Sequence, residues 1–412
     1  MISSLFAGVS GLRANANAMA VIGDNIANVN TTSFKTNRAS FANILSQSLS
    51  GSSSNDIGRG VQFWGTSSLW TQGSVENTSS PTDLAINGRG FFMVKDQIGN
   101  AFYTRAGSFK FDKEGNLVNP DGLKVQGYAI TSNGTLGSVA DICIPTGSVP
   151  PSPTDKMSLT VNLNADADPL IPDAYSTTVT VYDSLGSPVP VTMDFTCTAA
   201  NVWEWSASVA ASDGTVAPPA APYHIAFDSN GMLDPANCDP PGANPFIDIT
   251  LLNGADPLHI EWAYLNSLGN SDGTITGYAS PSTTTFLSQN GFPPGILQST
   301  SVDEQGYVTG VFSNGQLKPL YQIVLADFPS YQGLSALGKN LYAESRSSGE
   351  AMLGTAGNGR LGGISPNGLE MSNVDLASEF VKMITTQRAF QANSRVITTS
   401  DEILADLISI KR

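Results

Sequence analysis

The sequence predicts a mainly β chain framed by α-helical termini. Both ends carry apolar residues at spacings of three and four, which is typical of amphipathic helices. Between them, short runs of β-branched and aromatic residues alternate with Gly, Asn and Pro, as in strands and turns. The composition also changes near residues 146 and 299, where an acidic, proline-rich segment begins and ends. We therefore expect a discontinuous multi-domain chain: terminal helices in a coiled-coil-like domain, a β-rich middle domain and an inserted β-rich domain.

The two terminal helices, expected over residues 1–30 and 372–412, each present an apolar seam. Such seams require a partner helix, so the pattern indicates assembly rather than catalysis. In the C-terminal seam, polar residues are expected at Gln387, Ser394 and Asp401. The candidate assembly interface consists of Leu5, Val9, Leu12, Met19, Ile22, Ile26, Leu376, Phe380, Met383, Phe390, Ile397, Leu404 and Ile408.

The N-terminal helix is weak by itself. Between Met1 and Asn30 its only charged side chains are Arg13 and Asp24, and three glycines interrupt it. Because glycine disfavours helix and few charge pairs support the segment, we expect it to become ordered only on packing.

The C-terminal helix is expected to run from Val374 to Ile410 without a glycine or proline, a length of roughly 55 Å at 1.5 Å per residue. Ser372 or Asn373 is the expected N-cap, with Asp375 and Glu379 near the positive end of the helix dipole. One small domain rarely supports so long a helix, so partners are expected.

Composition excludes several classes of protein. With 41% hydrophobic residues, the chain of 412 residues is not disordered, and it contains no apolar run of the ~18 residues that a transmembrane helix needs. No conventional signal peptide is visible at the N-terminus. Cys143, Cys197 and Cys238 are odd in number and far apart, so they are expected to be buried free thiols rather than disulfides or zinc ligands.

The net charge of −15 is unevenly distributed. Between Thr146 and Thr300 there are fifteen Asp and Glu but only one base, Lys156, whereas the remainder is nearly neutral. No basic patch exists to neutralise phosphates, so a nucleic acid partner is excluded. The acidic segment either serves solubility or faces water while the neutral remainder is buried against other protein.

Proline-rich stretches mark the domain boundaries, because proline restricts both itself and its neighbour. We expect a connecting segment at 31–75, a discontinuous β-domain at 76–145 and 300–371, and an inserted acidic β-domain at 146–299. The two flanks must fold together, since neither alone resembles a complete core.

A short pattern of Asp followed three residues later by Gly recurs at Asp112, Asp228 and Asp303. The Asp side chain can accept hydrogen bonds from turn amides, and Gly tolerates positive φ, so the pattern predicts hairpin turns. A calcium loop is disfavoured, because the alternating oxygen ligands and the distal Glu are missing.

Two glycine-rich motifs resemble nucleotide-binding loops. Residues 357–362 match G-x-G-x-x-G but lie in a glycine-rich loop, expected over 345–368, with no strand before and no helix directly after. Residues 333–340 resemble a phosphate-binding loop after a strand predicted at 321–328, but Asn340 replaces the Ser or Thr that would hold magnesium. Surface turns are the better interpretation of both.

No catalytic or metal-binding arrangement is evident, and no cofactor is expected. His224 and His259 have neither ligand spacing nor a neighbouring nucleophile. A carbohydrate-binding or carbohydrate-active β-protein remains an alternative, with Trp203, Trp205 and Trp262 as sugar platforms beside acidic partners, although it gives the terminal helices no purpose.

Several motifs resemble those of the flagellar rod and hook proteins of bacteria. These motifs cover about 1–130 and 300–412, and Ser33 stands where many relatives have Gly. The inserted segment, with its Val-Tyr-Asp-Ser-Leu-Gly motif at 181–186, favours a hook protein over the shorter distal-rod proteins, which remain the alternative in the same class. The matching segments are Asn25–Thr31, Phe34–Lys35, Asp83–Phe92, Tyr103–Phe109, Ser372–Leu376, Met383–Ile384, Gln387–Asn393 and Thr399–Glu402.

This resemblance implies a structural role. Members form a tubular homopolymer outside the cell, in which the terminal helices line the inner tube, the first β-domain forms the wall and the inserted domain faces outward. The polymer would be a bendable joint that passes motor torque to the filament. The resemblance also implies export through the flagellar secretion apparatus, contacts with rod, hook–filament junction and hook cap proteins, and neither nucleic acid binding nor membrane insertion.

Overall fold

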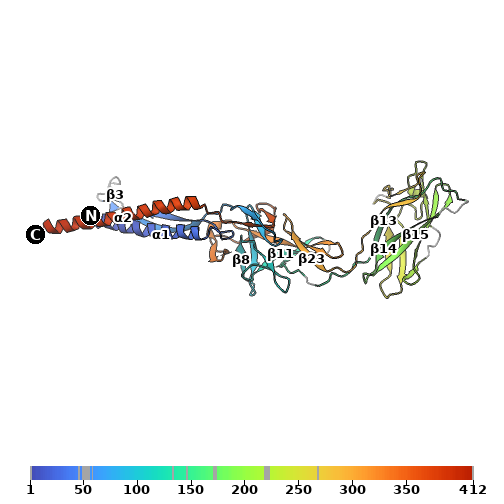
Figure 1. Ribbon diagram of the computed structural model, residues 1–412, viewed down its shortest axis with the longest axis horizontal. Coiled ribbons are helices and arrows are strands. Elements are labelled where there is room, and N and C mark those ends of the chain that lie inside the picture. The colour runs from blue at the N-terminus through green and yellow to red at the C-terminus, as the bar shows by residue number, and fades with distance from the viewer. Residues whose placement is uncertain are drawn as a thin grey trace. The chain divides into compact units, whose positions relative to one another are not determined.

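The computed structural model divides the described chain into two compact units (Figure 1). Unit 1 comprises Met1–Pro145, Ser299–Gly310 and Leu317–Arg412, and unit 2 comprises Thr146–Gln298 and Val311–Gln316. The structure describes residues 2–44, 47–48, 56–57, 59–131, 134–144, 147–169, 174–217, 223–266 and 269–410.

The terminal helices of unit 1 lie side by side (Figure 1). α1 spans Ile2–Ala27 and α2 spans Leu376–Ile410. The N-cap of α2 differs from the prediction: the carboxylate of Asp375 accepts the Ala377 N–H at 3.0 Å, so the cap is Asp375 rather than Ser372 or Asn373. The Asn373 side chain is occupied by other backbone partners, described below.

The expected connecting segment contains a strand hairpin that packs along α1. Strand β1, Asn37–Asn43, pairs antiparallel with β4, Val61–Ser68. The hairpin contacts α1, and the Val61 N–H donates to Ser10 Oγ at 3.2 Å. A second short pair is formed by β2, Gln47–Ser48, and β3, Asp56–Ile57.

The β-domain of unit 1 is built on one twelve-stranded sheet of described residues, in which β25 lies between β24 and β11. The strand predicted at 321–328 is found as the greater part of β25, and Phe91, Tyr103, Val324 and Phe328 form an aromatic-rich core on this sheet. The strands of the sheet are β7 Phe91–Lys95, β8 Ala101–Thr104, β9 Lys110–Phe111, β10 Leu117–Val118, β11 Lys124–Ile130, β12 Leu136–Asp141, β23 Leu297–Val302, β24 Tyr307–Phe312, β25 Leu317–Asp327, β26 Ser335–Gly338, β27 Leu341–Ala343 and β28 Met352–Thr355.

The prediction of a loop over residues 345–368 is wrong in part, because this segment contains strands. β28 pairs with the end of β25, and β29, Gly363–Pro366, pairs with β6, Leu84–Asn87. β30, Gly368–Glu370, pairs with β5, Val75–Asn77. The strands that pair with this segment are distant in sequence, so its glycine content does not predict its secondary structure. The G-x-G-x-x-G motif is the turn between β28 and β29, and the second glycine-rich motif continues from the short helix η2, Tyr331–Gly333, into the β26–β27 hairpin.

The Asp-x-x-Gly pattern forms hairpin turns, as predicted. In each, a glycine with positive φ donates its N–H to the first residue of the turn. The first Asp side chain accepts backbone N–H groups two or four residues later, and such bonds from Met232 and Asn230 lower the pKa of Asp228. The same turn also occurs at Asp96, Asn119 and Asp183.

Unit 2 consists of two sheets with one core between them. A four-stranded sheet in the order β14-β15-β16-β18 faces a six-stranded sheet in which β13 pairs with β20, β21 and β22. The alternating buried and exposed residues of β15 and β19 are typical of such a sandwich. The elements of unit 2 are β13 Lys156–Asn162, β14 Ala174–Tyr182, β15 Pro188–Ala199, β16 Val202–Val209, β17 Gly214–Val216, β18 Tyr223–Ala226, η1 Pro235–Asn237, β19 Phe246–Leu251, β20 Leu258–Trp262, β21 Ile275–Thr276 and β22 Thr283–Gln289.

The core of unit 2 contains the three tryptophans that the carbohydrate alternative would use. Trp203, Trp205 and Trp262 are at most 2% exposed, and the Trp205 and Trp262 rings meet edge to face at 4.8 Å. Buried rings cannot stack on a sugar, so this part of the alternative is wrong. Cys197 and Cys238 are buried, as expected, whereas Cys143 is only half-buried.

We predict that Trp262→Ala lowers the free energy of unfolding of unit 2 by about 3–5 kcal/mol, because it leaves a cavity among Phe195, Trp205 and Tyr264. Leu252→Ala is the control, since Leu252 is 68% exposed in the same unit and its loss should change the free energy by less than about 0.5 kcal/mol. Urea unfolding of the full chain followed by near-UV circular dichroism measures both. Equal losses would contradict this core assignment.

Candidate assembly interface and its polar junction

The face of α1 that packs on α2 is lined mainly by small residues. This differs from the prediction, in which large aliphatic residues form the seam; of those, Ile22 alone is fully buried, while Leu5, Val9, Leu12, Met19 and Ile26 lie half-buried on its flanks. Ala16, which continues the same spacing, is exposed. The buried residues of α1 are Gly8, Gly11, Ala14, Ala18, Ile22 and Asn25.

Two glycines allow the helices to approach closely. A Cβ at Gly8 would lie 3.1 Å from Ile397 Cγ1, and one at Gly11 would lie 2.7 Å from the side-chain amide of Asn393. Because interaxial distance depends on the side chains at the contact, these glycines set the spacing of the pair. They therefore serve packing, whereas the sequence alone shows them only as helix-weakening residues. The signal for this role is their spacing of three with Ala14.

The facing side of α2 mixes apolar and polar residues. Met383, Ile397 and Leu404, which belong to the predicted seam, are half-buried there. The polar positions differ from the prediction, because Ser394 and Asp401 are exposed and the residues one position earlier, Asn393 and Ser400, face α1. Ser400 Oγ lies 3.5 Å from Ser4 Oγ. A left-handed pair keeps a 3.5-residue repeat in register, so an offset of one residue moves a side chain off the seam.

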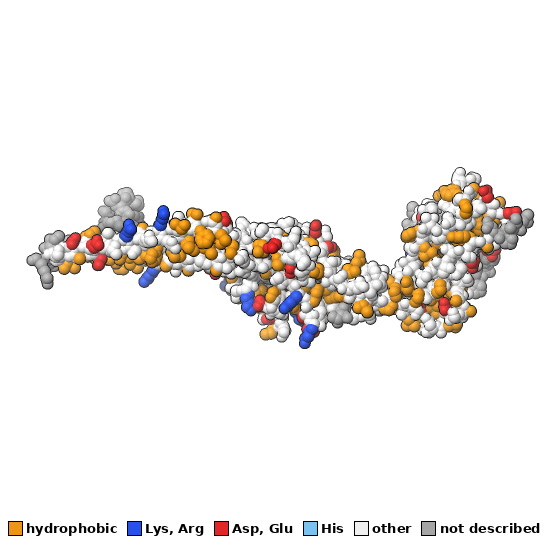
Figure 2. All heavy atoms as spheres, viewed as in Figure 1, with side chains coloured by type: hydrophobic (Ala, Val, Ile, Leu, Met, Phe, Trp, Pro, Cys, Tyr) orange, Lys and Arg blue, Asp and Glu red, His pale blue; other side chains and the backbone are white. Residues whose placement is uncertain are grey.

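The remaining predicted interface residues are exposed. Leu376, Phe380 and Phe390 expose 38–49% of their surface, and Ile408 exposes 70%. Further large apolar residues on the same two helices are exposed, and Figure 2 shows hydrophobic side chains spread along the helical pair. These are Phe6, Val381, Ile384, Val396 and Ile403.

This arrangement divides the apolar residues of α2 between two roles. One side holds α1 of the same chain, and the other sides display large apolar side chains to solvent. Contiguous exposed apolar surface on a folded protein marks an interaction site. The helical pair is therefore the candidate assembly interface. None of the helices described in this chain is long and apolar enough to cross a membrane.

A buried ion cluster lies where the helices meet the β-domain. The carboxylate of Glu370, in β30, is fully buried and pairs with Lys35 Nζ at 2.6 Å and Arg105 Nε at 2.9 Å. The Gly73 N–H also donates to it at 2.9 Å. Backbone carbonyls accept the other hydrogen bonds of the two cations. Lys35 Nζ donates to the carbonyl of Thr71, and the Arg105 guanidinium donates to those of Ile86, Gly88 and Gly90.

The electrostatics of the cluster favour the ionised carboxylate. Burial alone would raise the pKa of Glu370, but the charges of Arg105 and Lys35, with the hydrogen bond from Lys35, outweigh it and lower that pKa below its ordinary value of 4.5. Burial lowers the pKa of Lys35, and the opposing attraction of Glu370 only partly offsets this. The charges of Glu370, Lys35 and Arg105 therefore stabilise one another, and removal of any one leaves a buried charge without its partner.

Two asparagines tie the helix ends to the β-strands. Asn373, just before α2, accepts from the Thr36 N–H at 2.7 Å and donates to the backbone carbonyls of Leu69 and Thr71. Asn25, near the end of α1, exchanges hydrogen bonds with the backbone of Asn37.

Asn25 also links the two helices directly. Its amide donates at 3.1 Å to Glu379, a buried residue in the first turn of α2 that pairs with Lys382 at 2.6 Å. Buried polar side chains with this many partners fix one geometry.

Ser33 occupies the tight turn between α1 and β1. Its φ of 58° is in the left-handed region, which explains why glycine suits this position. Its N–H donates to the Glu370 carbonyl at 2.7 Å and its hydroxyl donates to the Arg105 carbonyl at 2.8 Å. The short motifs that resemble the rod and hook proteins therefore meet in space: Asn25, Lys35, Arg105 and Asn373 all belong to this junction. We name these four residues, together with Ser33 and Glu370, the polar junction.

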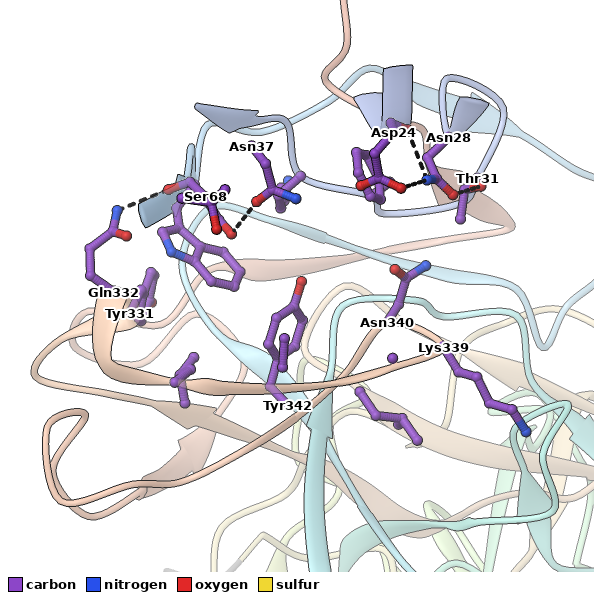
Figure 3. A pocket seen from close by; sticks show the side chains of 18 residues that line it. Asp24, Asn28, Thr31, Asn37, Ser68, Tyr331, Gln332, Lys339, Asn340 and Tyr342 are labelled. Carbon is purple, nitrogen blue, oxygen red and sulfur yellow. Dashed lines mark hydrogen bonds between the residues drawn. The ribbon is translucent and has the colours of Figure 1, made fainter. Parts of the chain in front are cut away.

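A hollow of about 500 Å³ lies beside the polar junction, between the end of α1 and the β26–β27 hairpin (Figure 3). Its described lining supplies amides, hydroxyls and aromatic rings, including Asn28, Ser68 and Tyr342. Its two lysines, Lys35 and Lys339, are both paired with carboxylates. Several lining groups form hydrogen bonds to one another: the Asn28 amide donates to Asp24, and the Ser68 hydroxyl donates to Asn37.

The two histidines lie on strands of unit 2. His224 is 3.3 Å from Asp239, and His259 Nδ1 is 2.5 Å from Asp248 with its ring stacked on Phe246. Within the described parts of the chain, no group of three or more His, Cys, Asp and Glu side chains is arranged to hold a metal ion.

We predict that Gly11→Leu melts the helical pair more readily than Gly23→Leu. Both substitutions gain about 1 kcal/mol of helix propensity. At Gly11, however, the side chain must displace Asn393, at a cost of about 1–3 kcal/mol, whereas a Cβ at Gly23 meets nothing within 4 Å. Thermal melting followed by far-UV circular dichroism compares the two variants. Identical melting curves would contradict the close approach at Gly11.

We also predict that Glu370→Gln costs about 3–5 kcal/mol of unfolding free energy, because it leaves Lys35 and Arg105 buried without their counter-charge. Glu350→Gln, at an exposed position of the same unit, is the control, expected within about 0.5 kcal/mol of the unsubstituted protein.

The same carboxylate makes stability depend on pH. Because the native pKa of Glu370 is below 4.5, its stabilising effect is fully present above that pH and is lost as the pH falls through the native pKa. Urea unfolding at several pH values should show a smaller loss of stability on acidification in Glu370→Gln than in Glu350→Gln. Parallel pH profiles would disprove the role of the ion cluster.

The chain matches four family models for flagellar axial proteins. They are the flagellar basal body rod protein at residues 5–35, the flagellar hook protein FlgE/F/G D1 domain at 85–164, the flagellar basal body protein FlaE D2 domain at 153–292, and the flagellar basal body rod FlgEFG protein C-terminal region at 366–410. The matches therefore fall on the helices, the first β-domain and the inserted unit.

Relatives match over nearly their whole length. The chain is 36% identical to the flagellar hook protein FlgE of Salmonella typhimurium, over 98% of both chains, and 34% identical to that of Treponema pallidum over 100% of both. The crystal structure of the Helicobacter pylori flagellar hook protein FlgE2 shares the fold, with a TM-score of 0.54 and 16% identity over 72% of this chain and 100% of that one. This chain belongs to the flagellar hook protein family.

Proposed function

We propose that this chain is a structural subunit of the bacterial flagellar hook and assembles with copies of itself into a flexible tube that transmits motor torque to the filament. The observation that carries the proposal is the pair of terminal helices with large apolar side chains left exposed, among them Leu376, Phe380 and Phe390. Those side chains need a covering surface, and a homopolymer supplies it with other copies.

The polar junction supports the mechanical part of this role. Torque must pass between the helices and the β-domain of each subunit, and the buried cluster at Glu370 joins the two at several points. Its ion pairs and hydrogen bonds are shielded from solvent, so salt screens them little. Bending can then occur between subunits while each junction keeps its geometry.

The role is structural, and we assign the chain no catalytic activity. Its place is the flagellum, and we propose that it reaches the cell exterior through the flagellar export apparatus and contacts rod, hook cap and hook–filament junction proteins there. Family membership supports this proposal, together with the self-association expected from the exposed helical surface.

The two alternatives are less favoured. A distal-rod protein would share both ends, but this chain matches the hook relatives over 98% or more of their length, including the inserted unit. The carbohydrate-binding alternative depends on Trp203, Trp205 and Trp262, which are buried in the core of unit 2.

Assembly tests the proposal directly. We expect the purified chain to form tubes visible by electron microscopy, and Phe380→Asp to abolish them, because a charge would replace a ring needed between copies. Phe380 is already 49% exposed, so the variant should keep the circular dichroism of the monomer. Ser79→Asp introduces the same charge at an exposed polar position of unit 1 outside the helical pair and is the control, expected to assemble.

Two further variants probe the predicted seam. Leu12→Asp and Ile397→Asp should prevent assembly and also weaken the helical pair, since both side chains are half-buried within one chain. Tubes of normal appearance from Phe380→Asp would refute the exposed helical surface as the assembly interface, and monomers under every condition for the unsubstituted chain would refute the homopolymer.

A further inference from the structure

Two exposed arginines of unit 1 converge on one buried carboxylate. Arg89 follows β6, and Arg360 lies in the turn between β28 and β29. Arg89 Nη2 is 3.4 Å from Asp327 Oδ1, and Arg360 Nε is 3.6 Å from Asp327 Oδ2. The Asp327 side chain is only 4% exposed, whereas those of Arg89 and Arg360 are 46% and 60% exposed.

An aromatic ring and a backbone hydrogen bond position the two arginines. The Arg89 guanidinium lies 5.0 Å from the centre of the Tyr331 ring, and Tyr331 donates its hydroxyl hydrogen to Asp327 at 2.5 Å. The Gly362 N–H donates to the Arg89 carbonyl at 2.7 Å, which ties the turn that carries Arg360 to the segment that carries Arg89. The G-x-G-x-x-G motif therefore presents an arginine beside another arginine.

This cluster carries a net positive charge with unused hydrogen-bond donors. One carboxylate balances only one of the two guanidinium groups, and each guanidinium has five N–H donors in a planar fork. The forks are suited to bidentate binding of a further carboxylate. These guanidinium N–H groups are at the surface, so a carboxylate that binds them comes from outside the cluster.

The charge distribution of the chain indicates the source of that ligand. Fifteen Asp and Glu but one base lie between Thr146 and Thr300, and exposed members include Asp166, Asp168 and Asp256. A positive site on one unit and a negative surface on the other make copies of this chain complementary to one another. A contact between two different patches on identical copies propagates instead of closing, as a tube requires.

We propose that Arg89 and Arg360 form a docking site for carboxylates of the acidic segment, residues 146–300, of a second copy of this chain. The site rests on the proposed function, because it is occupied only in the assembled tube. It adds a polar contact between copies to the apolar contacts of the helices, and a contact of this kind forms and breaks without exposing apolar surface.

Carbodiimide cross-linking of assembled tubes tests the site. The chain is prepared with Arg89→Lys and Arg360→Lys, which keep the charge and provide amines that the reagent joins to nearby carboxylates. Tubes are assembled from an equal mixture of unlabelled and ¹⁵N-labelled chains, so that a cross-linked peptide with one light and one heavy half joins two copies. Arg346→Lys, at an exposed arginine of the same unit, is the control.

We expect mixed-isotope peptides that link position 89 or 360 to an acid between 146 and 300, and none from position 346. Links confined to one isotope, or mixed-isotope links only to acids outside that segment, would overturn the proposal. Failure of the unsubstituted chain to form tubes would instead refute the proposed function, so the two failures are distinguishable.

Salt provides a second measurement. Arg89→Gln combined with Arg360→Gln should raise the critical concentration for assembly roughly two- to thirtyfold at 0.01 M salt, since two exposed ion pairs are lost. The difference should vanish at 1 M salt, where the Debye length falls from about 30 Å to about 3 Å. An unchanged critical concentration at low salt would also overturn the proposal.

Discussion

The structure of unit 1 depends on one buried carboxylate, Glu370. Strand β30, which carries it, directly precedes the C-terminal helix, and the two cations that neutralise it come from the start of the first hairpin and from the β-domain. An unpaired charge in this position would cost several kcal/mol, so Lys35 and Arg105 must be in place whenever the chain is folded. Segments more than 260 residues apart are thereby fixed to one another.

A second constraint applies to the helical pair. One side of α2 packs on α1 of the same chain, and we propose that its other sides contact neighbouring copies. Small residues on α1, above all Gly8 and Gly11, bring the helices close, and Asn393 and Ser400 place polar groups within their contact. Such polar groups make the contact specific in register. The large apolar residues of α2 remain available for neighbouring subunits.

Unit 2 illustrates a different balance. Its own core holds Trp203, Trp205 and Trp262, so its fold does not need the helices to bury its apolar residues. In the tube that we propose, its acidic surface acts on other copies through charge, in repulsion between like segments and in attraction to Arg89 and Arg360. Charge-mediated contacts of this kind weaken with salt, unlike the apolar contacts of the helices.

The sequence by itself determined the fold class, the helical termini, the Asp-x-x-Gly turns and, through its motifs, the family, because each of these depends on local periodicity or on short patterns. The tertiary structure alone decided which side chains meet. Leu376, Phe380 and Phe390 share the spacing of Met383 and Ile397, yet their exposure differs, since only the packed partner distinguishes one side of a helix from another. The polar junction could not be predicted either, because Lys35, Arg105 and Glu370 are distant in sequence and an ion pair leaves no periodic signal. Likewise, Arg360 acquires a neighbour in Arg89 only through the pairing of β29 with β6.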